Sequence, residues 1–411
     1  MRDFDSVSEK VFFDLFTRFY DSEKDAGKQH DPANYSLDRM YPLAELAGNP
    51  EKRLKIIHVA GTKGKGTTSQ FISTLLGSCG RRTGLFTSPH LCTVRERFQI
   101  DNALAPYYLL ISEASDFVTA VTKAGLTPSL FEIFTLLAMK MFVDSGVEYA
   151  VMETGIGGRL DATNYVSNPL ITVITPISFD HVALLGHTIE AIASEKAGII
   201  KPNVPLVLSR QPYAAAADVV RHRAAELSAP VYEPEELYEA DRFLPADSPQ
   251  FLRENFTSSL KAVRLLGMSP NPEDFTMPQL RARFECIHKN PMVVLDGAHN
   301  ADSMQKLVAA LNAIYPGVHW NVVLGAVKGK DVRGMTQALK NLNASFILTN
   351  PHTGKGSALP LLVEEAKTAG LSVSCVIESL TDVSQLPQDK PLIFTGSFFT
   401  ALIGEELFGE R

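Results

Sequence analysis

Short apolar runs alternate with longer apolar or amphipathic stretches along this chain. The short runs are rich in β-branched residues, which is typical of strands buried on both faces of a parallel sheet. We expect strands at 55–60, 147–152, 170–175, 205–209, 292–295, 320–324, 345–349, 372–377 and 392–395. Helices are predicted at 67–76, 130–144, 188–197, 251–266, 301–314, 332–342 and 359–369, after a helical lead-in over residues 1–50. This alternation predicts an α/β fold with helices on both faces of parallel sheets.

The chain has 411 residues, which is long for one hydrophobic core and comfortable for two. The stretch 230–250 places four prolines among acidic residues and is the most linker-like part of the sequence. A second break follows at 269–272, and the alternation restarts after Pro278. We therefore predict a P-loop-type parallel-sheet domain over 1–272 and a smaller, Rossmann-like C-terminal α/β domain over 273–411.

The composition is that of a soluble globular protein, with 45% hydrophobic residues, 21% charged residues and a net charge of −7. No run of Lys and Arg suggests a nucleic-acid partner, although a local basic site can still bind small anions. The four cysteines are scattered without a Cys-x-x-Cys pair, which favours free thiols over disulfides or zinc. No signal peptide or membrane span is evident, so we expect a cytoplasmic protein.

A glycine-rich loop separates the predicted strand 55–60 from the helix that follows it. The loop comprises Gly61, Thr62, Lys63, Gly64, Lys65, Gly66 and Thr67. A helix N-terminus behind glycines has unpaired N–H groups that bind phosphate. We predict that the loop binds ATP, with Lys65 on the outer phosphates and Thr67 on Mg²⁺. A turn without a ligand is the alternative, and Gly66 departs from the common pattern, in which Ser or Thr follows Lys directly.

Glu153 stands at the end of the predicted strand 147–152 and precedes the glycines of 155–158. Open α/β sheets bind ligands at the carboxyl ends of their strands, and a carboxylate there is a hard oxygen ligand for Mg²⁺. A surface carboxylate in a turn is the alternative interpretation, but the following glycines favour a loop that approaches a ligand closely.

An ordered set of motifs resembles folylpolyglutamate synthase and dihydrofolate synthase, which are Mur-type peptide ligases. The most specific matches are 57–67 (IHVAGTKGKGT), 153–164 (ETGIGGRLDATN) and 296–300 (DGAHN). The other matching segments are 88–91, 95–97, 180–181, 185–186, 195–199, 283–285 and 396–397. The resemblance covers nearly the whole chain.

The resemblance implies an ATP-dependent ligase that joins L-glutamate to a folate or dihydropteroate carboxylate through an acyl phosphate. It implies two Mg²⁺ sites, with Thr67, Glu153, His181 and Lys196 as ligands. The catalytic residues that it implies are Lys65, Glu153, His181, Lys196 and His299. Lys196 would carry a carbamate, which requires a lowered lysine pKa. From the residues alone, His181 reads as an ordinary hydrogen-bonded histidine and Lys196 as a solvated helix lysine.

The resemblance also implies further nucleotide and substrate contacts. Asn255, Arg283 and Asp296 would face the nucleotide, and His299 would lie near the phosphate or the incoming glutamate. Simple helix capping is the alternative role for Asp296 and Asn300. Ser88, Pro89 and His90 would form a loop on the folate side. Because the nucleotide would touch both halves, catalysis is expected to require domain closure.

The sequence leaves three alternatives for the function. The motifs do not separate folylpolyglutamate synthase from dihydrofolate synthase or from an enzyme with both activities. A muropeptide ligase is a second reading, and a non-catalytic P-loop switch or ATP-driven motor is a third. We expect a monomer.

Overall fold

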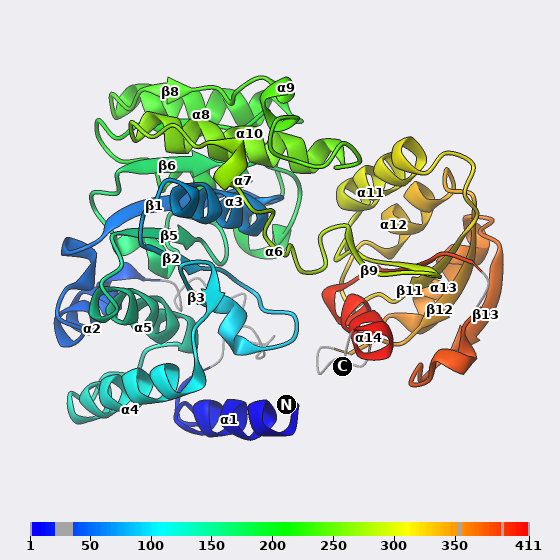
Figure 1. Cartoon of the computed structure of the whole chain (residues 1–411), viewed down its shortest axis with the longest axis horizontal. Helices are drawn as coiled ribbons and strands as arrows, with labels where there is room; N and C mark the ends of the chain where they lie inside the picture. Colours follow the sequence, from blue (N-terminus) through cyan, green and yellow to red (C-terminus); the bar gives the residue numbers. More distant parts are fainter. Residues whose placement is uncertain (1, 21–35, 352–355, 388–389, 410–411) are drawn as a thin grey trace. The chain divides into compact units, whose positions relative to one another are not determined.

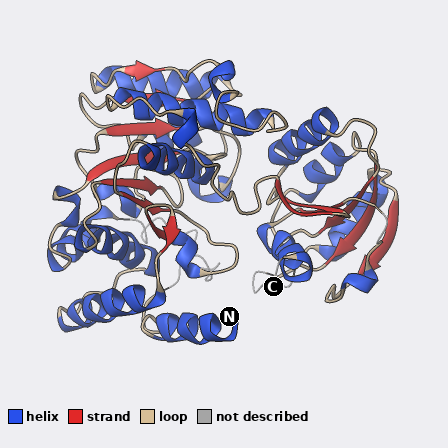
Figure 2. Cartoon of the chain, in the orientation of Figure 1, coloured by secondary structure: helices blue, strands red, loops and turns tan. Residues whose placement is uncertain are grey.

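The computed structural model describes residues 2–20, 36–351, 356–387 and 390–409 (Figure 1). The chain forms two compact units. The larger comprises Met1–Ala246 with Leu252–Pro278, and the smaller comprises Asp247–Phe251 with Gln279–Arg411. Figure 2 shows helices and strands interleaved within each unit. The two-domain α/β architecture predicted above is confirmed, and the functional assignment of 1–272 and 273–411 stays a prediction.

The larger unit is built on one sheet of eight strands. They are β1 Lys55–Ala60, β2 Thr83–Phe86, β3 Phe98–Ile100, β4 Ala103–Leu104, β5 Tyr149–Glu153, β6 Ile171–Ile174, β7 Leu206–Leu208 and β8 Val231–Tyr232. Their order across the sheet is β4-β3-β2-β5-β1-β6-β7-β8. The strands β2, β5, β1, β6, β7 and β8, in that order across the sheet, pair in parallel. The strands β3 and β4 are antiparallel additions at one edge.

Helices cover this sheet. They are α1 Arg2–Asp14, α2 Met40–Leu46, α3 Lys65–Ser78, α4 Tyr107–Lys123, α5 Leu130–Asp144, α6 Val182–Leu185, α7 Ile189–Ala197, α8 Ala214–Glu226, α9 Leu237–Ala240 and α10 Gln250–Leu265. Short 3₁₀ turns are η2 Leu37–Arg39, η3 Pro50–Lys52, η4 Val94–Arg97, η5 Ala162–Tyr165 and η6 Pro272–Asp274. Every residue of β2, β5, β6 and β7 is buried, as expected for strands covered on both faces.

Local sequence signals explain where the principal helices begin. Ser129 and Glu132 form a capping box at the start of α5. Thr188 accepts a hydrogen bond from the Ala191 N–H and caps α7, as predicted, and Gly198 ends that helix. The Thr188 cap fixes the start of the helix that carries Lys196.

The smaller unit has a six-stranded sheet. Its strands are β9 Glu285–Lys289, β10 Met292–Leu295, β11 Trp320–Leu324, β12 Ala344–Thr349, β13 Val373–Ile377 and β14 Leu392–Thr395, in the order β13-β12-β11-β14-β10-β9. Among the described strands of this smaller sheet, only β9, at one edge, pairs antiparallel with its neighbour. Its helices are α11 Ala301–Ile314, α12 Val332–Leu339, α13 Leu359–Thr368 and α14 Phe398–Phe408, and η7 Val383–Gln385 is a 3₁₀ turn.

The structure corrects the sequence prediction at the sheet edges. The stretch 230–250 is not a linker, because β8 within it pairs with β7 and extends the sheet. Its prolines are compatible with a strand at an edge, where the missing N–H costs no ladder bond. The sequence pattern does not predict the strands β2, β3, β4, β8 and β9 or the helices α4, α6, α8, α9 and α14. No helix of the described residues has the length and apolar character needed to cross a membrane.

Candidate active site

The phosphate loop connects β1 to α3, as predicted. Gly61 and Gly64 have φ values of 149° and 84°, which are left-handed conformations that favour glycine. The Thr62 and Lys63 N–H groups both donate to the Pro176 carbonyl oxygen at 3.0 Å. The loop is therefore anchored to the segment after β6, and its following residues, Lys65 to Thr67, form the first turn of α3.

Lys196 lies beneath this loop and is almost completely buried. Its Nζ donates to the Gly61 carbonyl oxygen at 2.8 Å. Burial and, after it, the Lys65 and Lys63 ammonium groups lower the pKa of Lys196, Asp180 and Asp161 partly oppose this, and the resulting pKa is about 7. The interpretation of Lys196 as a solvated helix lysine is therefore wrong.

Glu153 is buried at the carboxyl end of β5, beside the start of α3. Its Oε1 lies 4.0 Å from Lys65 Nζ, and its Oε2 accepts a hydrogen bond from the Ser88 N–H at 3.1 Å. A Cβ placed on Gly66 would lie 3.3 Å from Glu153 Oε2. The glycine that breaks the common phosphate-loop pattern thus stands where the carboxylate comes close to the helix. Glu153 is not a surface carboxylate.

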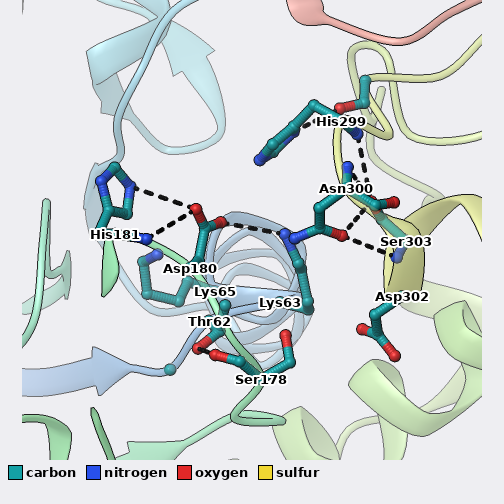
Figure 3. Close-up of polar contacts among 12 residues, drawn as sticks. Thr62, Lys63, Lys65, Ser178, Asp180, His181, His299, Asn300, Asp302 and Ser303 are labelled. Atoms are coloured by element: carbon teal, nitrogen blue, oxygen red, sulfur yellow. Dashed lines mark hydrogen bonds and ion pairs between the residues drawn. The ribbon is translucent and has the colours of Figure 1, made fainter. Parts of the chain in front are cut away.

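Asp180 links the loop to His181 (Figure 3). Its Oδ2 lies 3.2 Å from Lys63 Nζ, and its Oδ1 accepts the His181 N–H at 3.0 Å and lies 3.9 Å from His181 Nε2. His181 has a left-handed backbone, with φ of 49°, and precedes α6. The Thr62 hydroxyl donates to the Ser178 carbonyl oxygen at 3.1 Å, so the whole segment 176–181 borders the phosphate loop.

The glycines 155–158 form a second loop, organised by Asp161. One Asp161 oxygen accepts the Gly155 and Ile156 N–H groups, and the other accepts the N–H and hydroxyl of Thr163. Burial raises the pKa of Asp161, and these hydrogen bonds oppose the rise. A Cβ on Gly158 would lie 3.0 Å from the Lys196 Cα, so this loop packs directly on α7.

The segment 88–90 reaches the same region. Besides the bond from Ser88 to Glu153, His90 Nδ1 accepts a hydrogen bond from Arg97 Nε at 2.8 Å. Arginine can only donate, so the neutral imidazole of His90 must carry its proton on Nε2. Pro89 is exposed.

Asn255 also touches the phosphate loop. It is buried on α10, and its Oδ1 lies only 2.3 Å from the position that a Cβ on Gly64 would occupy. Helix α10 is held on α3 by the edge-to-face rings of Phe71 and Phe256 and by the Ser259 hydroxyl, which donates to the Thr68 carbonyl oxygen at 3.0 Å. The adenine contact proposed for Asn255 stays a prediction.

In the smaller unit, Asp296 follows β10 and is buried. Its oxygens accept the N–H groups of Ala298 at 2.8 Å and of Phe284 at 3.0 Å. Burial raises the pKa of Asp296 to about 6, opposed by the Ala298 N–H and by Arg283. The Arg283 guanidinium stacks over the Phe398 ring at 4.3 Å. Helix capping does not explain Asp296, because Asn300 is the N-cap of α11.

His299 lies just before α11 (Figure 3). Its Nδ1 contacts the Gly297 carbonyl oxygen at 2.8 Å, and because a carbonyl can only accept, Nδ1 carries the proton. Ser303 completes a capping box with Asn300. The predicted residues Arg283, Asp296 and His299 therefore cluster where β10 meets α11.

Comparison with known proteins gives two family matches. Residues 59–216 match the Mur ligase middle domain, and residues 282–396 match the Mur ligase glutamate ligase domain. A dihydrofolate synthase/folylpolyglutamate synthase of Bacillus subtilis (strain 168) is 34% identical over 343 residues, covering 74% of this chain and 79% of the relative. The folylpolyglutamate synthase of Lacticaseibacillus casei is 30% identical, covering 88% of this chain and 92% of that protein.

This chain belongs to the folylpolyglutamate synthase/dihydrofolate synthase family. A solved structure supports the assignment: the Mycobacterium tuberculosis folylpolyglutamate synthase complexed with ADP has a TM-score of 0.85 at 26% identity, with 99% of each chain covered. The predicted family is confirmed, and so is the main functional prediction, an ATP-dependent glutamate ligase.

The family implies Mg²⁺, and the larger unit offers suitable ligands for it. Glu153 supplies a buried carboxylate, and Thr67 supplies a buried hydroxyl in the first turn of α3. Within the described parts of the chain, no group of three or more His, Cys, Asp or Glu residues is placed to hold a metal. The predicted set contains only two such residues, Glu153 and His181, so this finding leaves it untested.

Sequence reasoning did not assign roles to two residues of this family member. Asp180 bridges Lys63 and His181, and Asp161 organises the 155–158 loop. The sequence could have indicated a role for Asp180, because this residue directly precedes His181 in a matched motif. Asp161 also lies in a matched motif, but its four hydrogen-bond donors depend on the conformation of the loop 155–163, which the sequence does not show.

Proposed function

We propose that this ligase acts on folate substrates as a monomer, using the residues around the phosphate loop to make an acyl phosphate. The folate carboxylate attacks the γ-phosphorus of ATP, and ADP leaves. The amine of L-glutamate then attacks the acyl carbon, phosphate leaves, and the amine loses a proton. The observation that carries the proposal is the convergence of Lys65, Glu153, Ser88 and Lys196 on one loop.

Each of these residues has a distinct physical task. Lys65 supplies positive charge to the migrating phosphoryl group, and the loop N–H groups hold the outer phosphates. Glu153 and Thr67 would hold one Mg²⁺, and His181 with a carbamate on Lys196 would hold a second; bound Mg²⁺ neutralises charge on the transferring phosphate. Residues 88–90 orient the folate carboxylate, and Asn255 contacts the adenine side.

A carbamate on Lys196 is compatible with its surroundings. The reaction needs a neutral amine and CO₂, and a pKa of about 7 leaves much of the amine neutral. The product retains one N–H, which preserves the hydrogen bond to the Gly61 carbonyl oxygen. The oxygens that it adds are hard ligands, suited to Mg²⁺.

The smaller unit would complete the reaction on the glutamate side. We propose that Arg283 and Asp296 contact the nucleotide, that His299 contacts the phosphate or glutamate, and that domain closure precedes chemistry. The closed state excludes water, which would otherwise hydrolyse the acyl phosphate.

The decisive experiment measures ATP turnover as a function of glutamate, with tetrahydrofolate and with dihydropteroate in parallel. Lys65→Ala and Glu153→Ala should each abolish glutamate-dependent turnover with either substrate. Lys123→Ala and Glu190→Ala, which alter exposed helix residues of the same types, serve as matched controls and should stay within twofold of the unmodified protein.

The outcome also selects among the activities. Turnover with dihydropteroate alone identifies a dihydrofolate synthase, turnover with tetrahydrofolate alone identifies a folylpolyglutamate synthase, and turnover with both identifies a bifunctional enzyme. ATP hydrolysis that ignores both glutamate and folate would contradict the proposal.

A further inference from the structure

The segment between β2 and β3 contains four consecutive backbone amides that point at two carboxylates. These are the N–H groups of residues 91–94. Glu96 accepts three of them, and Glu9 accepts the fourth. The distances are 2.7 Å from Leu91, 2.8 Å from Cys92 and 3.1 Å from Thr93 to Glu96, and 2.7 Å from Val94 to Glu9.

Part of this arrangement is ordinary helix capping. Thr93 is the N-cap of η4, and Glu96 is the third residue of a capping box, which accounts for the bond from the Thr93 N–H. Capping does not account for the Leu91 and Cys92 amides, which precede the turn. A run of amides without partners is a typical anion-binding site, and here the protein's own carboxylates occupy it.

The two carboxylates come from different parts of the larger unit. Glu96 belongs to the segment itself, whereas Glu9 projects from α1 at the start of the chain. Helix α1 is held in place by Phe12, whose ring centroid lies 5.8 Å from that of Phe134 and 6.4 Å from that of Phe98. The N-terminal helix is therefore anchored in the core of the larger unit and fixes one end of the amide run.

The immobilised amides directly follow the residues that reach the active site. The Ser88 N–H donates to Glu153, and His90 is oriented by Arg97, the last residue of η4. The segment 87–93 contains no helix or strand of its own. The bonds to the two carboxylates therefore add to the contacts of Ser88 and His90 and to the bonds of Thr87 and Thr93 in holding this segment.

We propose that Glu96 and Glu9 are positioning residues of the ligase reaction: they hold the amides of residues 91–94 and thereby fix residues 88–90 against Glu153 for the folate carboxylate. This inference rests on the proposed function for the identity of the substrate. Its structural part, the fixation of the segment by two carboxylates, does not. Charge-assisted hydrogen bonds to carboxylates are the strong class, which suits them to this task.

The first test is kinetic and compares Glu96→Ala, Glu96→Gln, Glu9→Ala and Lys10→Ala. Misplacing a reacting group by about 1 Å can cost on the order of 100-fold in rate. We expect Glu96→Ala to lower kcat/KM for the folate substrate by roughly 10- to 100-fold, while KM for ATP changes less than twofold. Glu96→Gln keeps one acceptor oxygen and should give an intermediate loss, and Glu9→Ala a smaller one. Lys10→Ala, on the exposed neighbour of Glu9, should have no effect.

The second test is hydrogen exchange of a peptide spanning 87–98, read by mass spectrometry. Exchange should accelerate in Glu96→Ala and Glu9→Ala and stay unchanged in Lys10→Ala, whether or not the protein turns over folate. Unchanged exchange in both glutamate variants refutes the fixation. Faster exchange with unchanged folate kinetics, or with equal losses for folate and ATP, refutes the positioning role. If the unmodified protein shows no folate-dependent turnover, the proposed function is wrong. The hydrogen-exchange rates of the 87–98 peptide then still test whether Glu96 and Glu9 fix the segment.

Discussion

Replacing Lys196 with methionine tests the most unusual feature of the site. Methionine keeps an unbranched chain of similar length but removes the amine. With a pKa of about 7, roughly three quarters of the Lys196 amine is neutral at pH 7.5. For an ordinary lysine the neutral fraction is about one in a thousand at that pH. The buried environment therefore raises the concentration of the CO₂-reactive form by roughly 700-fold.

The assay is ¹³C NMR of the protein in ¹³C-labelled bicarbonate, with glutamate-dependent ATP turnover measured on the same samples. The unmodified protein should show a carbamate signal that weakens as the pH falls below 7, because protonation removes the reactive amine. Lys196→Met should lose both the signal and the turnover. Lys140→Met is the control, because Lys140 pairs with Glu113 and Asp144, which raise its pKa and keep it charged.

Two results would refute this reasoning. A fully active protein without a carbamate signal would show that the free amine is the working form. A Lys196→Met variant that retains turnover within tenfold of the unmodified protein would show that Lys196 is not required.

Two further predictions concern the phosphate loop and the strand leading to it. Gly64→Ala should raise KM for ATP tenfold or more, because the new Cβ would lie 2.3 Å from Asn255 Oδ1. Gly80→Ala, just beyond the C-terminal end of α3, introduces the same left-handed strain with no neighbour within 4 Å and should leave that KM unchanged. His58 is fully buried, and burial, aided by Lys201, lowers its pKa from 6.5 to about 3. Between those two pKa values the unfolded chain binds a proton at His58 and the folded chain does not, so the free energy of unfolding should fall by about 2 kcal/mol as the pH falls from 6.5 to 4.5. In His58→Gln this part of the acid loss, read by urea unfolding, should disappear; an equal loss in both proteins would contradict it.

The sequence alone was sufficient for the fold class and for the phosphate loop. The buried parallel strand β10 consists of uninterrupted apolar residues, β1 is apolar apart from Lys55 and His58, and the capping residue Thr188 acts on an N–H group three positions away. Such local signals can be recognised in the sequence without knowledge of the fold. Edge strands such as β4 and β8 were missed because they are two residues long, and their pairing depends on neighbours that are distant in sequence.

The chemistry of individual side chains was decided by tertiary structure. In the sequence, Lys196 is one of many lysines on a helix; in the fold, burial beneath Gly61 lowers its pKa, because a charge removed from water is costly. Glu9 and Glu153 likewise look like ordinary acidic residues until the Val94 and Ser88 amides, 85 and 65 residues away, donate to them. Periodicity and caps are properties of neighbouring residues and can be read along the chain, whereas desolvation and charge coupling depend on which distant segments meet.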